Sequence, residues 1–309
     1  MDKELPFLVF IRQTIAEHYK NGYFFVLLGF LSLTIFFNFY FRLEKSLMYP
    51  LASHVSGIFI YILFYGFAYF SMLLLVLKNK KALWKSKRLW FLSLGVIVSL
   101  SVSATYFYIT PIIHSVENPE HRYLVRKILV NSRNIFFVAF PALLLWRYIK
   151  DKEDAFFWFS FKKIKLIHYV LFLLPVVFLA YLASFSDSFL VTYPTFKTHL
   201  ASNMLGIDKC IWKWIYEGLY AFDFVWVEFL FRGLLVIGLF QVLGRDAVIP
   251  MVSMYCFLHF GKPLGEAISS ILGGYFLGLL AIYSRSIVGG CFLHIGVALS
   301  MDIFATLRL

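Results

Sequence analysis

Nine apolar stretches follow one another along the 309-residue sequence. They lie at about 22–42, 55–77, 89–113, 130–148, 166–185, 213–243, 247–261, 265–283 and 288–306. A helix needs about 20 apolar residues to cross the hydrocarbon core of a membrane. Because lipid offers no partner to backbone polar groups, runs of this length predict helices. The fold class that follows is all-α: a polytopic transmembrane helical bundle of roughly eight or nine helices.

Two stretches depart from the length of a simple span. The stretch 213–243 is too long for one straight helix, and we expect it to begin with an interfacial turn near Glu217-Gly218. The stretch 247–261 is short, which is typical of a partly re-entrant segment.

The composition excludes several classes of protein. Hydrophobic residues make up 61% of the chain and charged residues only 15%, against about 25% in an ordinary soluble domain. A soluble enzyme, a disordered chain and the usual kind of nucleic-acid-binding domain are therefore excluded. Three widely spaced cysteines, Cys210, Cys256 and Cys291, give neither a disulfide framework nor zinc-binding spacing.

The formal net charge of +12 lies in short loops between the apolar runs. The connections 78–88 and 147–165 are both basic, and alternation of the spans places them on one side, which predicts the cytoplasm. The N-terminus is then cytoplasmic and the weakly charged loop 186–211 lies outside. The apolar stretch Leu5–Ile11 is too short and wrongly flanked for a signal peptide, and it predicts a short helix on the membrane surface.

Ionisable residues inside spans are costly and indicate function by default. They concentrate after about residue 165, which favours a division into N-terminal membrane helices of unassigned role (1–150), a basic cytoplasmic linker (151–165) and a membrane core that carries the candidate functional residues (166–309). The residues concerned are Asp223, Glu228, Arg232, His259, Glu266, His294 and Asp302.

Glu228 and Arg232 are four residues apart, so they share a helix face and can pair. A purely structural ion pair is an equally good interpretation of this segment alone. His259 ends an apolar run before Gly261-Lys-Pro263, and taken alone it fits a hydrogen-bonded packing residue. Glu266 taken alone fits an acid at a helix start.

His294 and Asp302 are eight residues apart, on broadly the same side of one helix. Asp302 taken alone fits a residue near the membrane end that reaches water.

Glu228, His259 and His294 come from three successive apolar segments and can converge in a bundle core. There a carboxylate can accept a proton from water, one histidine can orient the water and the other can stabilise an oxyanion. No cofactor is required, although the same three side chains are possible ligands of a divalent metal. The sequence has no His-Glu-x-x-His and no Gly-x-Ser-x-Gly motif.

Three motifs resemble those of the CPBP family, the CAAX-protease and bacteriocin-processing membrane proteins. They are Val227-Glu228-Phe-Leu-Phe-Arg232, Tyr255-Cys-Phe-Leu-His259 and His294-Ile-Gly-Val-Ala298. The family pattern is Glu-Glu-x-x-x-Arg, then Phe-x-x-x-His, then His-x-x-x-Asn or Asp. This chain departs from it with Val227 at the first Glu and Ala298 at the last position, so it resembles a divergent member.

The resemblance covers about residues 166–306. It implies an intramembrane endopeptidase that hydrolyses a membrane-anchored or lipidated protein, with Glu228 as base, His259 positioning water and His294 at the oxyanion. Arg232, Glu266 and Asp302 would support them. It also implies a bacterial plasma membrane.

Two other functions stay open. One is a non-catalytic membrane scaffold or immunity protein that binds a peptide partner in the same place. The other is an ion-coupled transporter, against which the absence of internal repeats counts. No nucleic-acid partner is expected.

Overall fold

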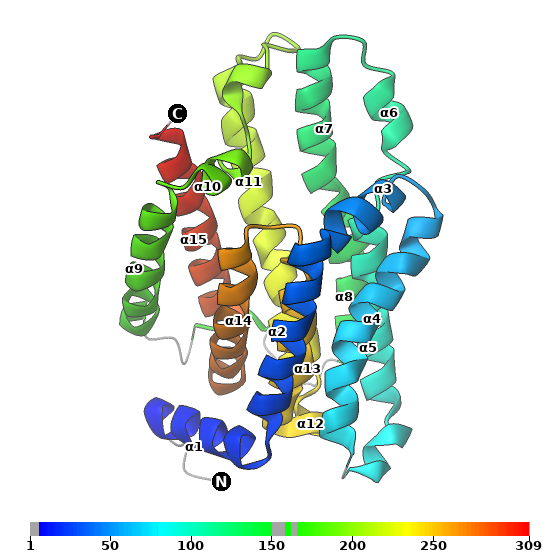
Figure 1. The fold of residues 1–309 in the computed structure, drawn as a ribbon, viewed down its shortest axis with the longest axis vertical. Coiled ribbons are helices and arrows are strands. Elements are labelled where there is room, and N and C mark those ends of the chain that lie inside the picture. The colour runs from blue at the N-terminus through cyan, green and yellow to red at the C-terminus, as the bar shows by residue number, and fades with distance from the viewer. Residues whose placement is uncertain (1–5, 79, 150–157, 162–165, 309) are drawn as a thin grey trace.

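The computed structural model describes residues 6–78, 80–149, 158–161 and 166–308. Helices make up the architecture throughout these residues, which confirms the all-α fold class (Figure 1). The predicted linker 151–165 lies outside the described residues except for 158–161.

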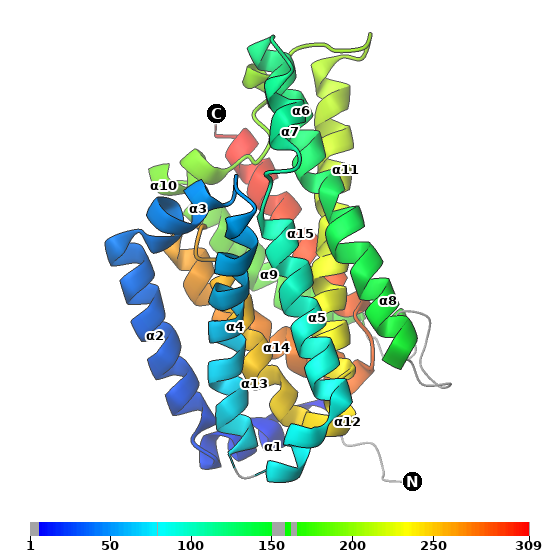
Figure 2. The same cartoon turned by 90° about the vertical axis from the view of Figure 1, so that its right-hand side faces the viewer.

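Apart from α1, which crosses one end of the bundle, the first half of the chain supplies helices on one side of it (Figure 2). They are α1 (Phe7–Lys20), α2 (Tyr23–Phe41), the π-helical η1 (Glu44–Met48), α3 (Tyr49–Leu51), α4 (Ser56–Leu77), η2 (Lys81–Lys85), α5 (Lys87–Ala104), α6 (Thr110–His114), α7 (Pro119–Asn134), the π-helical η3 (Ile135–Ala139) and α8 (Phe140–Ile149).

The second half supplies the helices that carry the candidate site. They are α9 (Leu166–Ala183), α10 (Asp187–Thr192), η5 (Thr198–Leu200), α11 (Lys209–Glu228), the π-helical η6 (Phe229–Ile237), α12 (Phe240–Leu243), η7 (Gly244–Ala247), α13 (Val248–Phe257), α14 (Leu264–Ser284) and α15 (Val288–Thr306).

Seven helical stretches of the described chain are long and apolar enough to cross a membrane. This supports an integral membrane protein, with fewer such helices than the eight or nine expected. The difference arises because 209–257 forms one stretch by this measure, and because α9 contributes only a shorter apolar helix, Tyr169–Ala183. Within 209–257 the chain reverses at α12, so α11 and α13 run in opposite directions (Figure 1).

Three expected boundaries are wrong. The helix expected over 89–113 ends at Ala104, where Thr105 is extended. The helix expected over 130–148 begins at Pro119, because the Asn118 side chain accepts hydrogen bonds from the backbone N–H groups of Glu120 and His121. The turn expected near Glu217-Gly218 is absent, since α11 passes through both residues without a break.

Helix α13 is the centre of the bundle. All ten of its residues are buried, and it packs against α4 and α14. Helix α15 packs against α9 on one side and α11 on the other. Tyr255 on α13 lies near His294 on α15, and His294 in turn contacts Glu228 at the end of α11.

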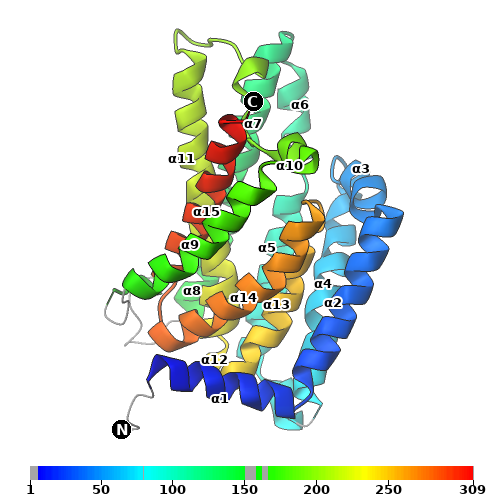
Figure 3. The same cartoon turned by 60° about the vertical axis from the view of Figure 1, so that its left-hand side comes forward.

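Helix α1 runs across one end of the bundle, nearly perpendicular to the long helices (Figure 3). A helix does form at the expected stretch, and it continues beyond Ile11 to Lys20. His18 fixes it: its imidazole is fully buried, with Nδ1 2.8 Å from the Tyr275 hydroxyl and Nε2 3.2 Å from Asp246. Lys80 also pairs with Asp246, at 2.6 Å.

Candidate functional site

Glu228 is the last residue of α11, at the point where the helix changes to the π-helical segment η6. This segment runs for nine residues, and Gly238 closes it by donating its N–H to the Gly233 carbonyl at 2.7 Å. Short π-helical insertions often occur at functional sites because they re-aim side chains. Here the change of winding falls between Glu228 and Arg232.

The Glu228 carboxylate is fully buried and contacts two polar side chains, those of Arg232 and His294. Arg232 Nη1 lies 3.1 Å from Glu228 Oε1, the ion pair that the four-residue spacing predicts. His294 Nδ1, on α15, lies 3.0 Å from the same oxygen. The site therefore joins two helices through one carboxylate oxygen.

Gly290 leaves room for the Glu228 carboxylate to pack against α15. A Cβ at position 290 would lie 2.2 Å from Glu228 Oε2. Any side chain at this position would have to displace the carboxylate, so the glycine allows α15 to approach.

Tyr255, on α13, connects the remaining side chains. The guanidinium carbon of Arg232 lies 4.2 Å from the centre of its ring, a cation–π contact. The Tyr255 ring also neighbours both imidazoles, with centroids 4.7 Å from His259 and 6.2 Å from His294. Its hydroxyl lies 3.5 Å from His294 Nε2.

The hydrogen bonds assign the proton positions on both histidines. His259 Nδ1 lies 2.9 Å from the Tyr255 carbonyl oxygen, which can only accept, so Nδ1 donates. His294 Nδ1 likewise donates to the Glu228 carboxylate. In the neutral form each ring then presents a lone pair on Nε2.

The two other acidic candidates lie outside this cluster. Glu266 accepts a hydrogen bond from the Tyr193 hydroxyl at 2.6 Å. Asp302 accepts bonds from the backbone N–H of Thr195, at 2.9 Å, and from its hydroxyl. Both acids therefore bind the segment between α10 and α11.

Within the described residues, no three histidine, cysteine or acidic side chains come together as a metal would require. Glu228 and His294 are in contact, but His259 reaches them only through Tyr255. The structure therefore brings together two of the three possible metal ligands named from the sequence.

The sequence pattern places Tyr255 only at a motif position and gives no functional role to Gly290. The signal for Gly290 was present, since Gly289-Gly290 lies one helical turn before His294 and small residues are typical of close helix contacts in membranes.

The fold and the site define a class: a polytopic helical membrane protein with a buried Glu–Arg–His cluster between α11, α13 and α15. Comparisons with protein-family models, with curated proteins and with solved structures find no match for this chain.

Proposed function

We propose that the chain is an intramembrane endopeptidase of the CPBP type, which hydrolyses a peptide bond in a membrane-anchored or lipidated protein. The observation that carries the proposal is the contact between His294 Nδ1 and the buried Glu228 carboxylate. A carboxylate that fixes one ring nitrogen of a histidine leaves the other nitrogen ready to accept a proton.

The exposed fractions of the two side chains favour His294, rather than Glu228, as the group that contacts the reacting water. Its side chain is 15% exposed, whereas the Glu228 side chain is 0% exposed. In the proposed reaction, water gives a proton to His294 Nε2 as its oxygen bonds to the substrate carbonyl carbon. Glu228 stabilises the imidazolium that forms. The imidazolium then protonates the leaving nitrogen as the C–N bond breaks.

His259 and Arg232 keep the roles expected from the sequence, whereas Tyr255 takes the oxyanion role expected of His294. Because His259 donates through Nδ1, its Nε2 can accept the second hydrogen of the water and align it. The Tyr255 hydroxyl, near His294 Nε2, is the group able to donate to the oxyanion. Arg232 pairs with the Glu228 carboxylate and fixes its position.

The test compares new protein termini in membranes of cells that carry the intact chain, Glu228→Gln, His294→Gln or the matched control Glu120→Gln. Glu120 is exposed on α7, outside the cluster. Loss of a proton acceptor lowers such rates by about 10²–10⁴-fold. We expect one membrane protein to accumulate uncleaved with the first two variants and not with the control. Unchanged termini in both site variants, at normal expression, would refute the proposal.

A non-catalytic scaffold is the second candidate. The observation that favours it is the complete burial of both Glu228 and Arg232, which also suits a structural ion pair. A scaffold would lose no cleavage product in His294→Gln and would retain its peptide partner in co-purification.

A further inference from the structure

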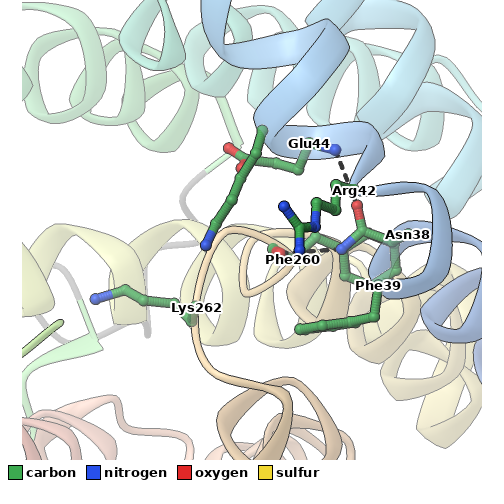
Figure 4. A pocket seen from close by; sticks show the side chains of 7 residues that line it. Asn38, Phe39, Arg42, Glu44, Phe260 and Lys262 are labelled. Carbon is green, nitrogen blue, oxygen red and sulfur yellow. Dashed lines mark hydrogen bonds between the residues drawn. The ribbon is translucent and has the colours of Figure 1, made fainter. Parts of the chain in front are cut away.

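A pocket of about 340 Å³ lies where α2 ends beside the loop that joins α13 to α14 (Figure 4). Its volume falls in the usual range of small-molecule sites. It is separate from the Glu228 cluster, and its lining comes from two distant parts of the sequence: Asn38, Phe39, Arg42, Glu44, Lys45, Phe260 and Lys262.

Asn38 holds the two parts of the pocket together. Its side-chain amide donates to the Phe260 carbonyl at 3.0 Å and accepts from the backbone N–H of Glu44 at 3.0 Å (Figure 4). The side chain is buried, so these bonds are shielded from water. The pocket is therefore formed before any ligand binds.

The pocket carries an excess of positive charge. Arg42, Lys45 and Lys262 line it, and within the described chain none of the three has an acidic group at ion-pair distance. The Lys262 ammonium is 3.5 Å from the Tyr193 hydroxyl. Arg42 and Lys45 thus remain available to an anion.

Glu44 is the one acidic group of the lining. Its carboxyl group packs against Gly261, where an added Cβ would lie 3.0 Å away. Burial raises the pKa of Glu44, an effect that the charge of Lys45 opposes. The charge of the pocket stays positive in either protonation state.

The surface beside the pocket is apolar. Helix α2 is a candidate membrane span that ends at Phe41, one residue before Arg42. Phe36, Phe37, Tyr40 and Phe41 are all exposed along its last turns. Cations at the end of a span, next to exposed aromatic rings, lie at the depth of lipid headgroups.

We propose that this pocket binds the phosphate group of an anionic glycerophospholipid, with the acyl chains along the exposed aromatic face of α2. Arg42 and Lys45 pair with the phosphate, Asn38 keeps the pocket open, and the rings of α2 contact the chains. The phosphate chemistry alone would also suit free inorganic phosphate, whereas the neighbouring apolar face favours the lipid.

The experiment titrates the full chain, purified in detergent, with phosphatidylglycerol, phosphatidylcholine or inorganic phosphate, and follows thermal unfolding. We expect phosphatidylglycerol alone to stabilise the protein. Each cation near a membrane surface contributes about fivefold to such affinity. Arg42→Gln/Lys45→Gln should then weaken binding by about 25-fold, and Glu44→Gln should strengthen it because an opposing charge is removed.

The matched control is Lys85→Gln/Lys87→Gln, which removes two exposed cations at the other end of α4 and α5. We expect it to bind phosphatidylglycerol as the unaltered chain does. Equal weakening in both double variants would mean general electrostatic attraction and would overturn the proposal. Equal stabilisation by inorganic phosphate would assign the pocket to a free anion and would overturn the lipid assignment.

Discussion

Gly290 and Glu228 lie so close that a Cβ on the glycine would be 2.2 Å from the carboxylate oxygen Oε2. The contact joins α15 to the end of α11, and the same carboxylate binds His294 one turn further along α15. The close approach of the two helices and the position of the carboxylate therefore depend on each other.

Gly290→Ala should displace the Glu228 side chain and destabilise the protein by about 1–3 kcal/mol, the usual cost of overpacking a core. Thermal unfolding in detergent measures this. Gly273→Ala is the matched control, since Gly273 is a helical glycine of α14 with nothing within 4 Å of an added Cβ. Equal stability of the two variants would show that the α11–α15 contact is looser than described.

Arg232→Met should destabilise the chain by about 3–5 kcal/mol, because it leaves the buried Glu228 carboxylate without its cation. Adding Glu228→Gln should restore part of the stability, since the unpaired charge is then gone. A double-mutant cycle followed by chemical unfolding measures the coupling. Strictly additive effects would contradict the pairing.

His18→Leu should loosen α1 from the end of the bundle. The change leaves the buried Tyr275 hydroxyl without its partner, at about 1–3 kcal/mol, whereas Asp246 loses His18 but keeps Lys80. Amide hydrogen exchange should rise across α1 and stay unchanged in α15. Gln13→Ala, at an exposed position of the same helix, is the control, and equal exchange in both variants would refute the anchoring role.

Cys210 should react with a maleimide in the folded protein, whereas Cys256 and Cys291 should react only after unfolding. The first thiol is exposed and the other two are buried. In intact cells an impermeant maleimide should label Cys210 from outside, because the charged loops predict that the connection before α11 faces outward. Labelling only after the cells are opened would reverse the predicted orientation, and Cys210→Ser should abolish it.

The sequence predicted several helices to within one residue. The stretch 288–306 coincides with α15, and α2 and α4 differ from their predicted bounds by one residue at most. Prediction failed at α7, where charged residues of the first turns resembled a loop although Pro119 and the Asn118 cap begin a helix. The charged composition suggested a loop, whereas the Asn118 cap and Pro119 indicate the start of a helix.

Only those contacts of the site that join residues close in the sequence could be predicted. The pairing of Glu228 with Arg232 follows from their spacing on one helix. The contact of Glu228 with His294 joins residues 66 positions apart and depends on the packing of α11 against α15. The position of Tyr255 beside Arg232 and both histidines depends on the packing of α13, which periodicity does not specify.

The central helix α13 has a consequence for how the protein is made. Its ten residues span about 15 Å, half of the hydrocarbon thickness, and none of them faces outward. Such a segment cannot hold its own position in a bilayer, so its depth is set by α4, which is synthesised earlier, and α14, which follows. Since Tyr255 lies on α13 and His259 directly follows it, the cluster comes into being only after α14 and α15 have entered the membrane.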